Sequence, residues 1–169
     1  GFDTAINIAM ECIDRLHTTA ESHHRIIVVE IMGRHAGWIA VEAGIAGGAD
    51  MILIPEIPID IDEVCAAIEK RHSRGKIFSI IVVAEGAQFK KGAAVLQEQN
   101  LDAFGHVRLG GIGEALAKEI EKKTGYETRV SVLGHIQRGG TPTAFDRILG
   151  TRFGVKAIEL VKDKKYGRM

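Results

Sequence analysis

Cysteine, proline and aromatic residues are scarce in this sequence, and neither sign of charge is in excess. The 169 residues include two cysteines and three prolines, and Phe, Trp and Tyr together make up 5% of them. Cys12 and Cys65 are too few for a disulfide framework or a metal cluster, and they fit the reducing conditions of the cytoplasm, where we expect this protein. Lys and Arg number 22, as do Asp and Glu. No nucleic-acid partner is expected, because backbone binding needs a basic excess.

Long apolar stretches, a secretion signal and an initiator methionine are also missing. The longest apolar run, residues 77–84, is interrupted by Ser79 and is too short to cross a bilayer, so no membrane partner is expected. The first three residues have neither the basic start nor the apolar region of a signal peptide. Because the sequence starts at Gly1 and stops after Met169 without a tail, we interpret it as a piece of a longer protein.

The composition that remains is that of one ordinary globular domain, with 46% hydrophobic and 26% charged residues. Helical spacing of apolar residues alternates along the chain with short runs of β-branched residues. The spacing predicts helices over residues 3–21, 36–46, 60–73, 109–123 and 142–162. The β-branched runs predict strands over residues 25–31, 51–54, 78–84 and 128–133, and residues 90–100 are left unassigned. This alternation predicts an α/β fold, a three-layer α/β/α arrangement with a mostly parallel sheet covered on both faces.

Polar residues follow three of the predicted strands, where a parallel sheet binds its ligands. They occur in residues 32–37, at Glu85 and Gly86, and in residues 134–140. Arginine pairs with phosphate oxygens through a planar fork, a carboxylate accepts from sugar hydroxyls, and glycines let a ligand approach backbone N–H groups. The sequence therefore predicts a small, phosphorylated and hydroxyl-rich ligand.

Each of these features also has an ordinary structural explanation. A single arginine at a strand end is usually solvated or paired with a carboxylate, and glycines after strands are usually turn residues. The coincidence of three such ends at one sheet edge favours a ligand site. Elsewhere, Trp38 is interpreted as core packing at a helix start, Asp3 as a helix N-cap, and residues 109–113 as a closely packed helix start.

At the polar segments that follow the predicted strands, the sequence resembles the 6-phosphofructokinase family. Residues 32–37 read Met-Gly-Arg-His-Ala-Gly, and residues 133–142 read Leu-Gly-His-Ile-Gln-Arg-Gly-Gly-Thr-Pro. Residues 84–86, Ala-Glu-Gly, lie between the two blocks, and Asp146, Arg147 and residues 152–154 follow them. The blocks are long, lie at the family's spacing, and extend the resemblance over essentially the whole chain.

The resemblance implies a phosphofructokinase-like fold and a glycolytic kinase reaction. In that reaction a phosphoryl group passes from ATP, or from pyrophosphate, with Mg²⁺ to the 1-hydroxyl of fructose 6-phosphate. Residues 1–169 would then be the fructose 6-phosphate-binding domain of a longer two-domain enzyme, with the helix at about 142–162 packing on the missing nucleotide domain. The implied sugar-phosphate contacts are Arg25, Met32, Gly33, Arg34, Glu85, Arg129, His135, Ile136, Gln137 and Arg138.

Two of these contacts imply an oligomer. Arg25 and Arg129 match family arginines that reach the substrate of a neighbouring subunit, which implies a homo-oligomer, typically a homotetramer, with shared active sites. Arg34 would support catalysis. The family's catalytic base lies in a Thr-x-Asp-x-Asp stretch that would precede Gly1, so this chain is expected to be inactive alone and to hold no firm metal site.

An effector site maps in part onto this chain. The matching positions are Gly48, Ala49, Asp50, Arg74, Lys76, Ile77 and Phe78. His17, however, stands where regulated members have an arginine, and residues 74–76 are equally explained as a solvated turn that closes a helix. Retained allosteric control, a pyrophosphate rather than an ATP donor, and a sugar-phosphate-binding or regulatory module without catalysis all stay open at this point.

Overall fold

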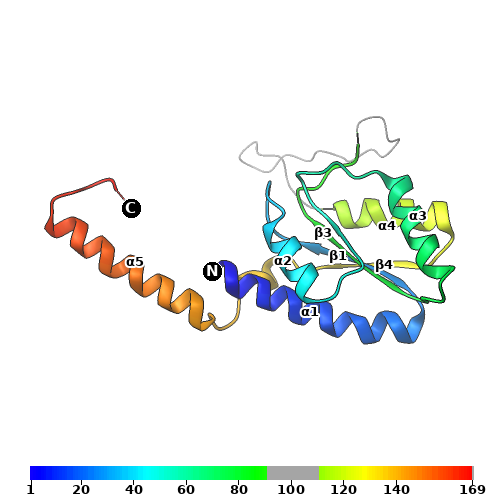
Figure 1. Ribbon diagram of the computed structural model, residues 1–169, viewed down its shortest axis with the longest axis horizontal. Helices are drawn as coiled ribbons and strands as arrows, with labels where there is room; N and C mark the ends of the chain where they lie inside the picture. The colour runs from blue at the N-terminus through cyan, green and yellow to red at the C-terminus, as the bar shows by residue number, and fades with distance from the viewer. Residues whose placement is uncertain (91–110, 169) are drawn as a thin grey trace.

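The computed structural model describes residues 1–90 and 111–168 (Figure 1). Within these residues the chain forms helices α1 (Phe2–His23), α2 (Trp38–Ala46), α3 (Ile61–His72), α4 (Ile112–Thr124) and α5 (Ala144–Lys162). The strands are β1 (Ile26–Ile31), β2 (Met51–Leu53), β3 (Ser79–Ala84) and β4 (Thr128–Val132), and a short 3₁₀ helix, η1 (Gly134–Arg138), follows the last of them. Helices and strands alternate as the sequence predicts.

The four strands form one parallel sheet in the order β2-β3-β1-β4. Strands β1 and β3 are buried along their whole length and pair in register from Ile26 with Ser79 to Ile31 with Ala84. Because β1 lies between β3 and β4, the carboxyl ends of these three strands meet at one edge. That edge carries all three polar segments that the sequence analysis singled out.

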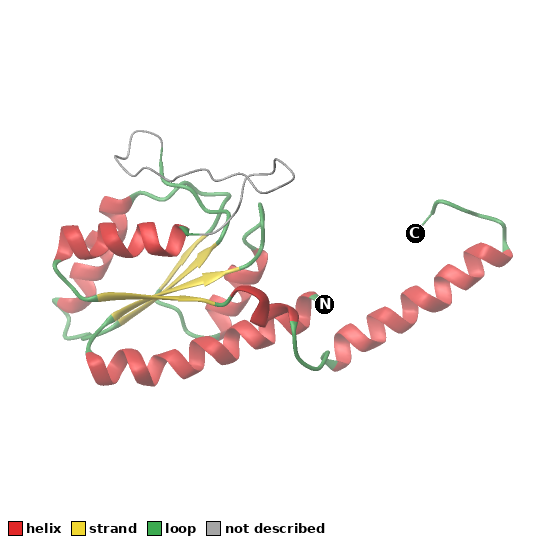
Figure 2. Ribbon diagram, turned by 180° about the vertical axis from the view of Figure 1, so that it is seen from behind, coloured by secondary structure: helices red, strands yellow, loops and turns green. Residues whose placement is uncertain are grey.

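Helices cover both faces of the sheet, which confirms the three-layer α/β/α prediction (Figures 1 and 2). On one face, Ile27, Val29 and Ile31 of β1 pack with Ala9 and Ile13 of α1 and with α2. On the other face, Ile26 and Val28 pack with α3 and α4. Alternate side chains of a strand point to opposite faces, so β1, which is apolar except at Glu30, supplies both halves of the core.

Local signals explain where several helices begin and end. Asp60 caps α3, because its carboxylate accepts the backbone N–H groups of Asp62 and Glu63 at 3.1 and 3.4 Å. Helix α4 is terminated by its C-cap Gly125, whose φ of 74° suits glycine. At the start of α4, a Cβ on Gly113 would lie 3.0 Å from Glu30 and from Val130, which confirms the predicted close packing.

Two expectations at helix starts are corrected, and a third lies partly outside the described residues. Trp38 is 65% exposed, because α2 packs on the core through Ala40, Ala43 and Gly44 while its first residue faces outward. Asp3 lies inside the first turn of α1 rather than at its N-cap, which is Gly1. Helix α4 starts at Ile112, and the predicted earlier part, residues 109 and 110, lies outside the described residues, as do residues 91–100 of the unassigned segment.

Helix α5 extends away from the rest of the molecule (Figures 1 and 2). None of its residues is buried, and its exposed apolar side chains are Phe145, Ile148, Phe153, Val155, Ile158 and Val161. No helix in the described part of the chain is both long and apolar enough to cross a membrane.

Candidate functional site

The three loops of the carboxyl edge start side by side because the sheet pairing continues past the strand ends. The Glu85 N–H donates to the Ile31 carbonyl at 2.8 Å, and the Leu133 N–H donates to the Glu30 carbonyl at 3.0 Å. Residues 32–37, Glu85 and η1 are therefore held next to one another before any side-chain contact is considered.

The loop after β1 is a tight turn whose backbone faces Glu85. The N–H groups of Gly33 and Arg34 both donate to Glu85 Oε1, at 3.1 and 2.9 Å. Arg34 has a φ of 53°, which is uncommon for a residue other than glycine, and the turn closes with a 3.1 Å bond from the Ala36 N–H to the Gly33 carbonyl. Two consecutive amides of the turn are thus oriented by one carboxylate from the neighbouring strand.

The loop after β4 contributes a second acceptor to the same turn. Gln137 Oε1 accepts the Met32 N–H at 2.8 Å. Gln137 is 3% exposed, whereas the side chains of His135, Ile136 and Arg138 on the same 3₁₀ helix are exposed. The sequence predicts a loop here, and the 3₁₀ helix places Gln137 and Arg138 on the side facing residues 32–34.

These three loops enclose a cavity of about 210 Å³. Its lining residues are Ala5, Met32, Gly33, Arg34, Ile39, Glu85, Gln137 and Arg138. Two guanidinium groups and one carboxylate give the lining a net positive charge. Charge-assisted bonds to an anionic group, and acceptors for hydroxyls beside it, are the chemistry that such a lining offers.

Six of the ten predicted substrate contacts line this cavity, while the other four lie elsewhere. His135 and Ile136 lie on η1 beside the cavity and are exposed. Arg25 and Arg129 lie at the opposite edge, at the amino ends of β1 and β4. There both contact Glu127, with Arg25 Nε 2.9 Å and Arg129 Nη2 2.5 Å from its carboxylate oxygens, and Arg25 lowers the pKa of Glu127.

Glu30 is a buried carboxylate near the site that the sequence analysis did not single out. Only 3% exposed, it accepts the Gly113 N–H at 2.8 Å and the Gly111 N–H at 3.2 Å, at the start of α4. Burial raises the pKa of Glu30, while the bonds from Gly113 and Gly111 act in the opposite direction. A charged residue inside a six-residue apolar strand was the signal, because a buried carboxylate needs donors.

The predicted effector residues gather at the amino edge of the sheet. Both oxygens of the Asp50 carboxylate are engaged there, one by Arg71 Nη2 at 2.7 Å and the other by the Ile80 N–H at 2.9 Å. Gly48, Ala49 and Phe78 lie beside it, and Phe78 makes an edge-to-face contact with the ring of His17. Arg74, Lys76 and Ile77 are exposed on the turn after α3, in keeping with the simpler explanation that the sequence allowed.

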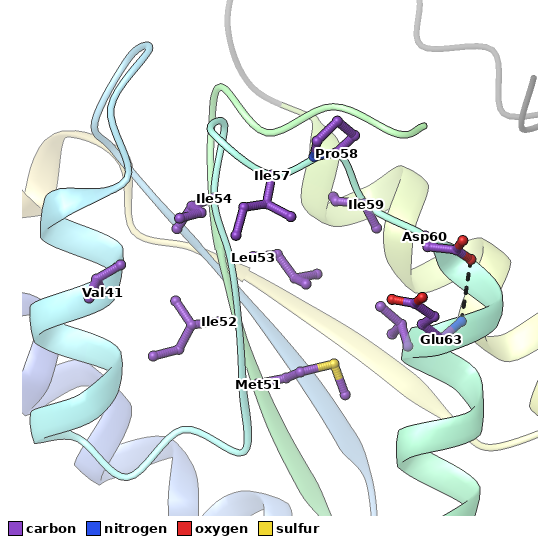
Figure 3. Close-up of a pocket in the computed structure, with 11 residues that line it drawn as sticks. Val41, Met51, Ile52, Leu53, Ile54, Ile57, Pro58, Ile59, Asp60 and Glu63 are labelled. Atoms are coloured by element: carbon purple, nitrogen blue, oxygen red, sulfur yellow. Dashed lines mark hydrogen bonds between the residues drawn. The ribbon is translucent and has the colours of Figure 1, made fainter. Parts of the chain in front are cut away.

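A larger cavity of about 510 Å³ lies against strand β2, between α2 and α3 (Figure 3). Its lining is mainly aliphatic, from residues 51–54 and 57–59 with Val41 and Val64. Of its two carboxylates, Asp60 is already used as the cap of α3. This lining offers no group for polar recognition comparable with the carboxyl edge.

The fold and the carboxyl edge define a parallel α/β domain with a polar cavity beyond the ends of three adjacent strands, the place where parallel sheets bind their ligands. A family model described as phosphofructokinase matches residues 1–161, and the chain belongs to this family.

The names of the relatives of this chain specify two different phosphoryl donors, pyrophosphate and ATP. The pyrophosphate–fructose 6-phosphate 1-phosphotransferase of Streptomyces coelicolor is 60% identical over 169 residues, which are 100% of this chain and 49% of that protein. The ATP-dependent 6-phosphofructokinase of Corynebacterium efficiens is 57% identical over 166 residues, 98% of this chain and 48% of that protein. The chain thus spans about half the length of the curated relatives that it matches.

Solved structures give the same result for the fold. Phosphofructokinase from Saccharomyces cerevisiae superposes with a TM-score of 0.74 at 40% identity, covering 92% of this chain and 19% of that one. The pyrophosphate-dependent phosphofructokinase from Marinobacter aquaeolei has a TM-score of 0.75 at 25% identity, over 96% of this chain and 39% of that one.

Proposed function

We propose that this chain forms the sugar-phosphate side of a phosphofructokinase active site and that the protein transfers a phosphoryl group to the 1-hydroxyl of fructose 6-phosphate. The observation that carries this proposal is the convergence of Arg34, Glu85 and Arg138 on one cavity at the carboxyl edge. Membership of the family supplies the substrate class, and the cavity has the charges that a phosphorylated sugar needs.

Each polar group in the cavity has a proposed task. Arg138, with His135 beside it, binds the sugar phosphate through charge-assisted hydrogen bonds. Arg34 lines the same cavity, where it balances charge on the transferred phosphoryl group. Glu85 uses Oε1 to hold the turn and directs its other oxygen to the sugar hydroxyls. Met32 and Gly33 form the backbone wall against the sugar.

Arg25 and Arg129 are proposed to serve a neighbouring subunit. Both lie at the edge opposite the cavity, so neither reaches a substrate bound there in the same chain. With both beside Glu127, they form a basic pair at the surface that suits the phosphate of a substrate in the adjacent copy. This assignment makes the protein a homo-oligomer with shared active sites, and we retain the homotetramer as the proposed form.

The phosphoryl donor and the catalytic base are assigned to other parts of the longer protein. Among the described residues no three His, Cys, Asp or Glu side chains gather as ligands for a metal, so these residues do not fit a Mg²⁺ site and we derive no step through one. Glu85 already accepts two backbone N–H groups, and we assign it no role as a base. We assign the choice of donor, ATP or pyrophosphate, to those other parts as well.

An assay of the full-length protein tests the proposal. Fructose 6-phosphate is offered with ATP and, separately, with pyrophosphate, and formation of fructose 1,6-bisphosphate is followed through coupling enzymes. Product with either donor is expected and identifies the donor. Absence of product with both donors would leave a sugar-phosphate-binding or regulatory module and overturn the proposed reaction.

Replacing Arg138 by alanine tests the proposed site within that enzyme. A charge-assisted hydrogen bond contributes about 1.5–3 kcal/mol, so we expect kcat/KM for fructose 6-phosphate to fall by about 10- to 150-fold. Arg15→Ala removes an exposed arginine of α1 and serves as the matched control, with unchanged kinetics. Unchanged kinetics in Arg138→Ala as well would show that the site is wrongly assigned.

A further inference from the structure

Gln137 carries a buried side-chain amide on the 3₁₀ helix η1, whose neighbouring side chains are exposed. It is 3% exposed, while the side chains on either side of it on η1 are exposed. Its Oε1 accepts the Met32 N–H at 2.8 Å, a contact across 105 positions of sequence. Its Nε2 is also buried and has no acceptor among the described residues. A buried amide with an unpaired N–H is unfavourable for folding. We therefore look for the role of Gln137 in the hydrogen bond that its Oε1 accepts from the Met32 N–H.

That bond completes the support of the turn after β1. The N–H groups of Met32, Gly33 and Arg34 are consecutive, and all three donate to side-chain acceptors on other strand ends. The first donates to Gln137 and the other two to Glu85, so neither acceptor alone holds the whole turn. The left-handed backbone at Arg34 is one that L-residues adopt at a cost unless surrounding contacts fix it.

The two acceptors differ in what else they can do. Glu85 is only partly buried and has a second carboxylate oxygen for a ligand. Gln137 is enclosed, and the next residue along η1 is Arg138, whose side chain is exposed. The bond from Gln137 therefore joins the loop that carries Arg138 to the turn that carries Arg34.

We propose that Gln137 is a positioning residue for the sugar-phosphate site, acting through the Met32 amide rather than by touching the ligand. It holds the loops after β1 and β4 at one fixed spacing, so that Arg34 and Arg138 face the same substrate. The inference rests on the proposed function, because it assigns the spacing a role in binding fructose 6-phosphate.

The test compares variants of the full-length protein. Gln137→Met keeps the length of the side chain but replaces the amide oxygen that accepts the Met32 N–H by a thioether, which is a much weaker acceptor. We expect its KM for fructose 6-phosphate to rise about three- to tenfold, the change that corresponds to one neutral hydrogen bond. Its KM for the phosphoryl donor should stay within twofold of wild type. Gln137→Asn, which keeps the amide but shortens its reach, should show the same selective rise if the methionine variant fails to fold.

A matched core variant separates positioning from a general loss of stability. Ile120→Val shortens a fully buried side chain of α4 and lowers Tm without contacting the site. Its KM for fructose 6-phosphate should equal that of wild type. A Gln137 variant that loses Tm but keeps KM, or one in which kcat and both KM values change together, overturns the positioning role.

The same experiment distinguishes failure of this inference from failure of the proposed function. Thermal stabilisation by fructose 6-phosphate is measured beside the kinetics. Wild-type protein that is neither stabilised by this sugar nor able to phosphorylate it overturns both. Active wild type with an unchanged KM in Gln137→Met overturns the inference alone.

Discussion

At the scale of single residues, two glycines let the backbone of the carboxyl edge close on itself. A Cβ added to Gly86 would lie 1.8 Å from the Arg34 carbonyl oxygen. One added to Gly33 would lie 2.5 Å from the Ala36 carbonyl oxygen. Both contacts are with backbone atoms, which cannot move aside as a flexible side chain can. The shape of the turn beside the cavity therefore depends on the absence of a methyl group at these two positions.

Gly86→Ala is accordingly expected to damage the site. Forcing an extra methyl into a closely packed position costs about 1–3 kcal/mol, and here the strain falls on the Arg34 backbone, so kcat/KM for fructose 6-phosphate should fall by about tenfold or more. Gly150→Ala is the control, because a Cβ at Gly150 of α5 meets nothing within 4 Å. Steady-state kinetics and Tm of both variants provide the measurement. Kinetics in Gly86→Ala that match those of the control would contradict the tight packing.

The sequence locates the more accessible residues of the candidate site better than the buried ones. Arg34, Glu85 and Arg138 follow predicted strands, and parallel pairing is sufficient to bring them together. Burial of Gln137 has no such signal, because a lone amide in a loop follows no period. Glu30 is different, since a carboxylate within an apolar strand indicates a buried partner, but not that the partner is the start of α4, 81 and 83 positions away.

At the scale of elements, α1 receives its cap from α5. The Asp146 carboxylate accepts the Thr4 N–H at 2.8 Å and the Thr4 hydroxyl, and it lies 2.9 Å from the Gly1 nitrogen. In return, the Thr143 hydroxyl donates to Asp3 at 2.5 Å. No side chain of α1 caps its own N-terminus. The starts of the two helices are thus joined by a small polar network.

This network gives a pH-dependent prediction for Asp146→Asn. Hydrogen bonds from the Thr4 hydroxyl and from the Thr4 N–H lower the pKa of Asp146 from its ordinary value of 3.8. A lowered pKa stabilises the folded state above pH 3.8, and this contribution is lost as the pH falls below that value. Asp146→Asn should therefore be less stable than wild type at neutral pH and should lose less stability than wild type as the pH falls below 3.8.

Urea unfolding, followed by circular dichroism at several pH values, measures the difference. Asp14→Asn removes an exposed carboxylate of α1 and should leave the pH profile unchanged. Parallel profiles for wild type and Asp146→Asn would contradict the role of this carboxylate.

The elements themselves follow closely from the sequence, and the differences have local causes. Periodicity and β-branched runs are enough to predict each of the four strands in residues 1–90 and 111–168. The predicted burial of Trp38 is wrong because it rested on the size of the side chain alone, whereas α2 packs on the core through small residues. The junction of α1 with α5 could not be predicted, because the ends of two amphipathic segments give no sign of which one supplies the cap.

At the scale of the whole molecule, this half of the protein is similar to relatives that name different donors. Its identity to the Streptomyces coelicolor and Corynebacterium efficiens proteins differs little, at 60% and 57%. The cavity at the carboxyl edge is proposed to bind the sugar phosphate rather than the donor. Donor selection is therefore proposed to lie in the portion that this chain does not span.

Exchange of this half between enzymes tests that separation. This chain is inserted in place of the matching segment of each of the two relatives, and each chimera is assayed with ATP and with pyrophosphate. The chimera based on the Corynebacterium protein is expected to use ATP, and the one based on the Streptomyces protein to use pyrophosphate. A chimera that changes its donor would place selection within residues 1–169.

The attachment of α5 has a geometrical consequence. Its 19 residues make a rod about 28 Å long, joined to α1 at its first turn and beginning six positions after Arg138. The near end of the helix is therefore fixed beside the candidate cavity, whereas its far end lies about 28 Å away. We propose that this length carries the chain from the loop after β4 onto the nucleotide domain of the longer protein.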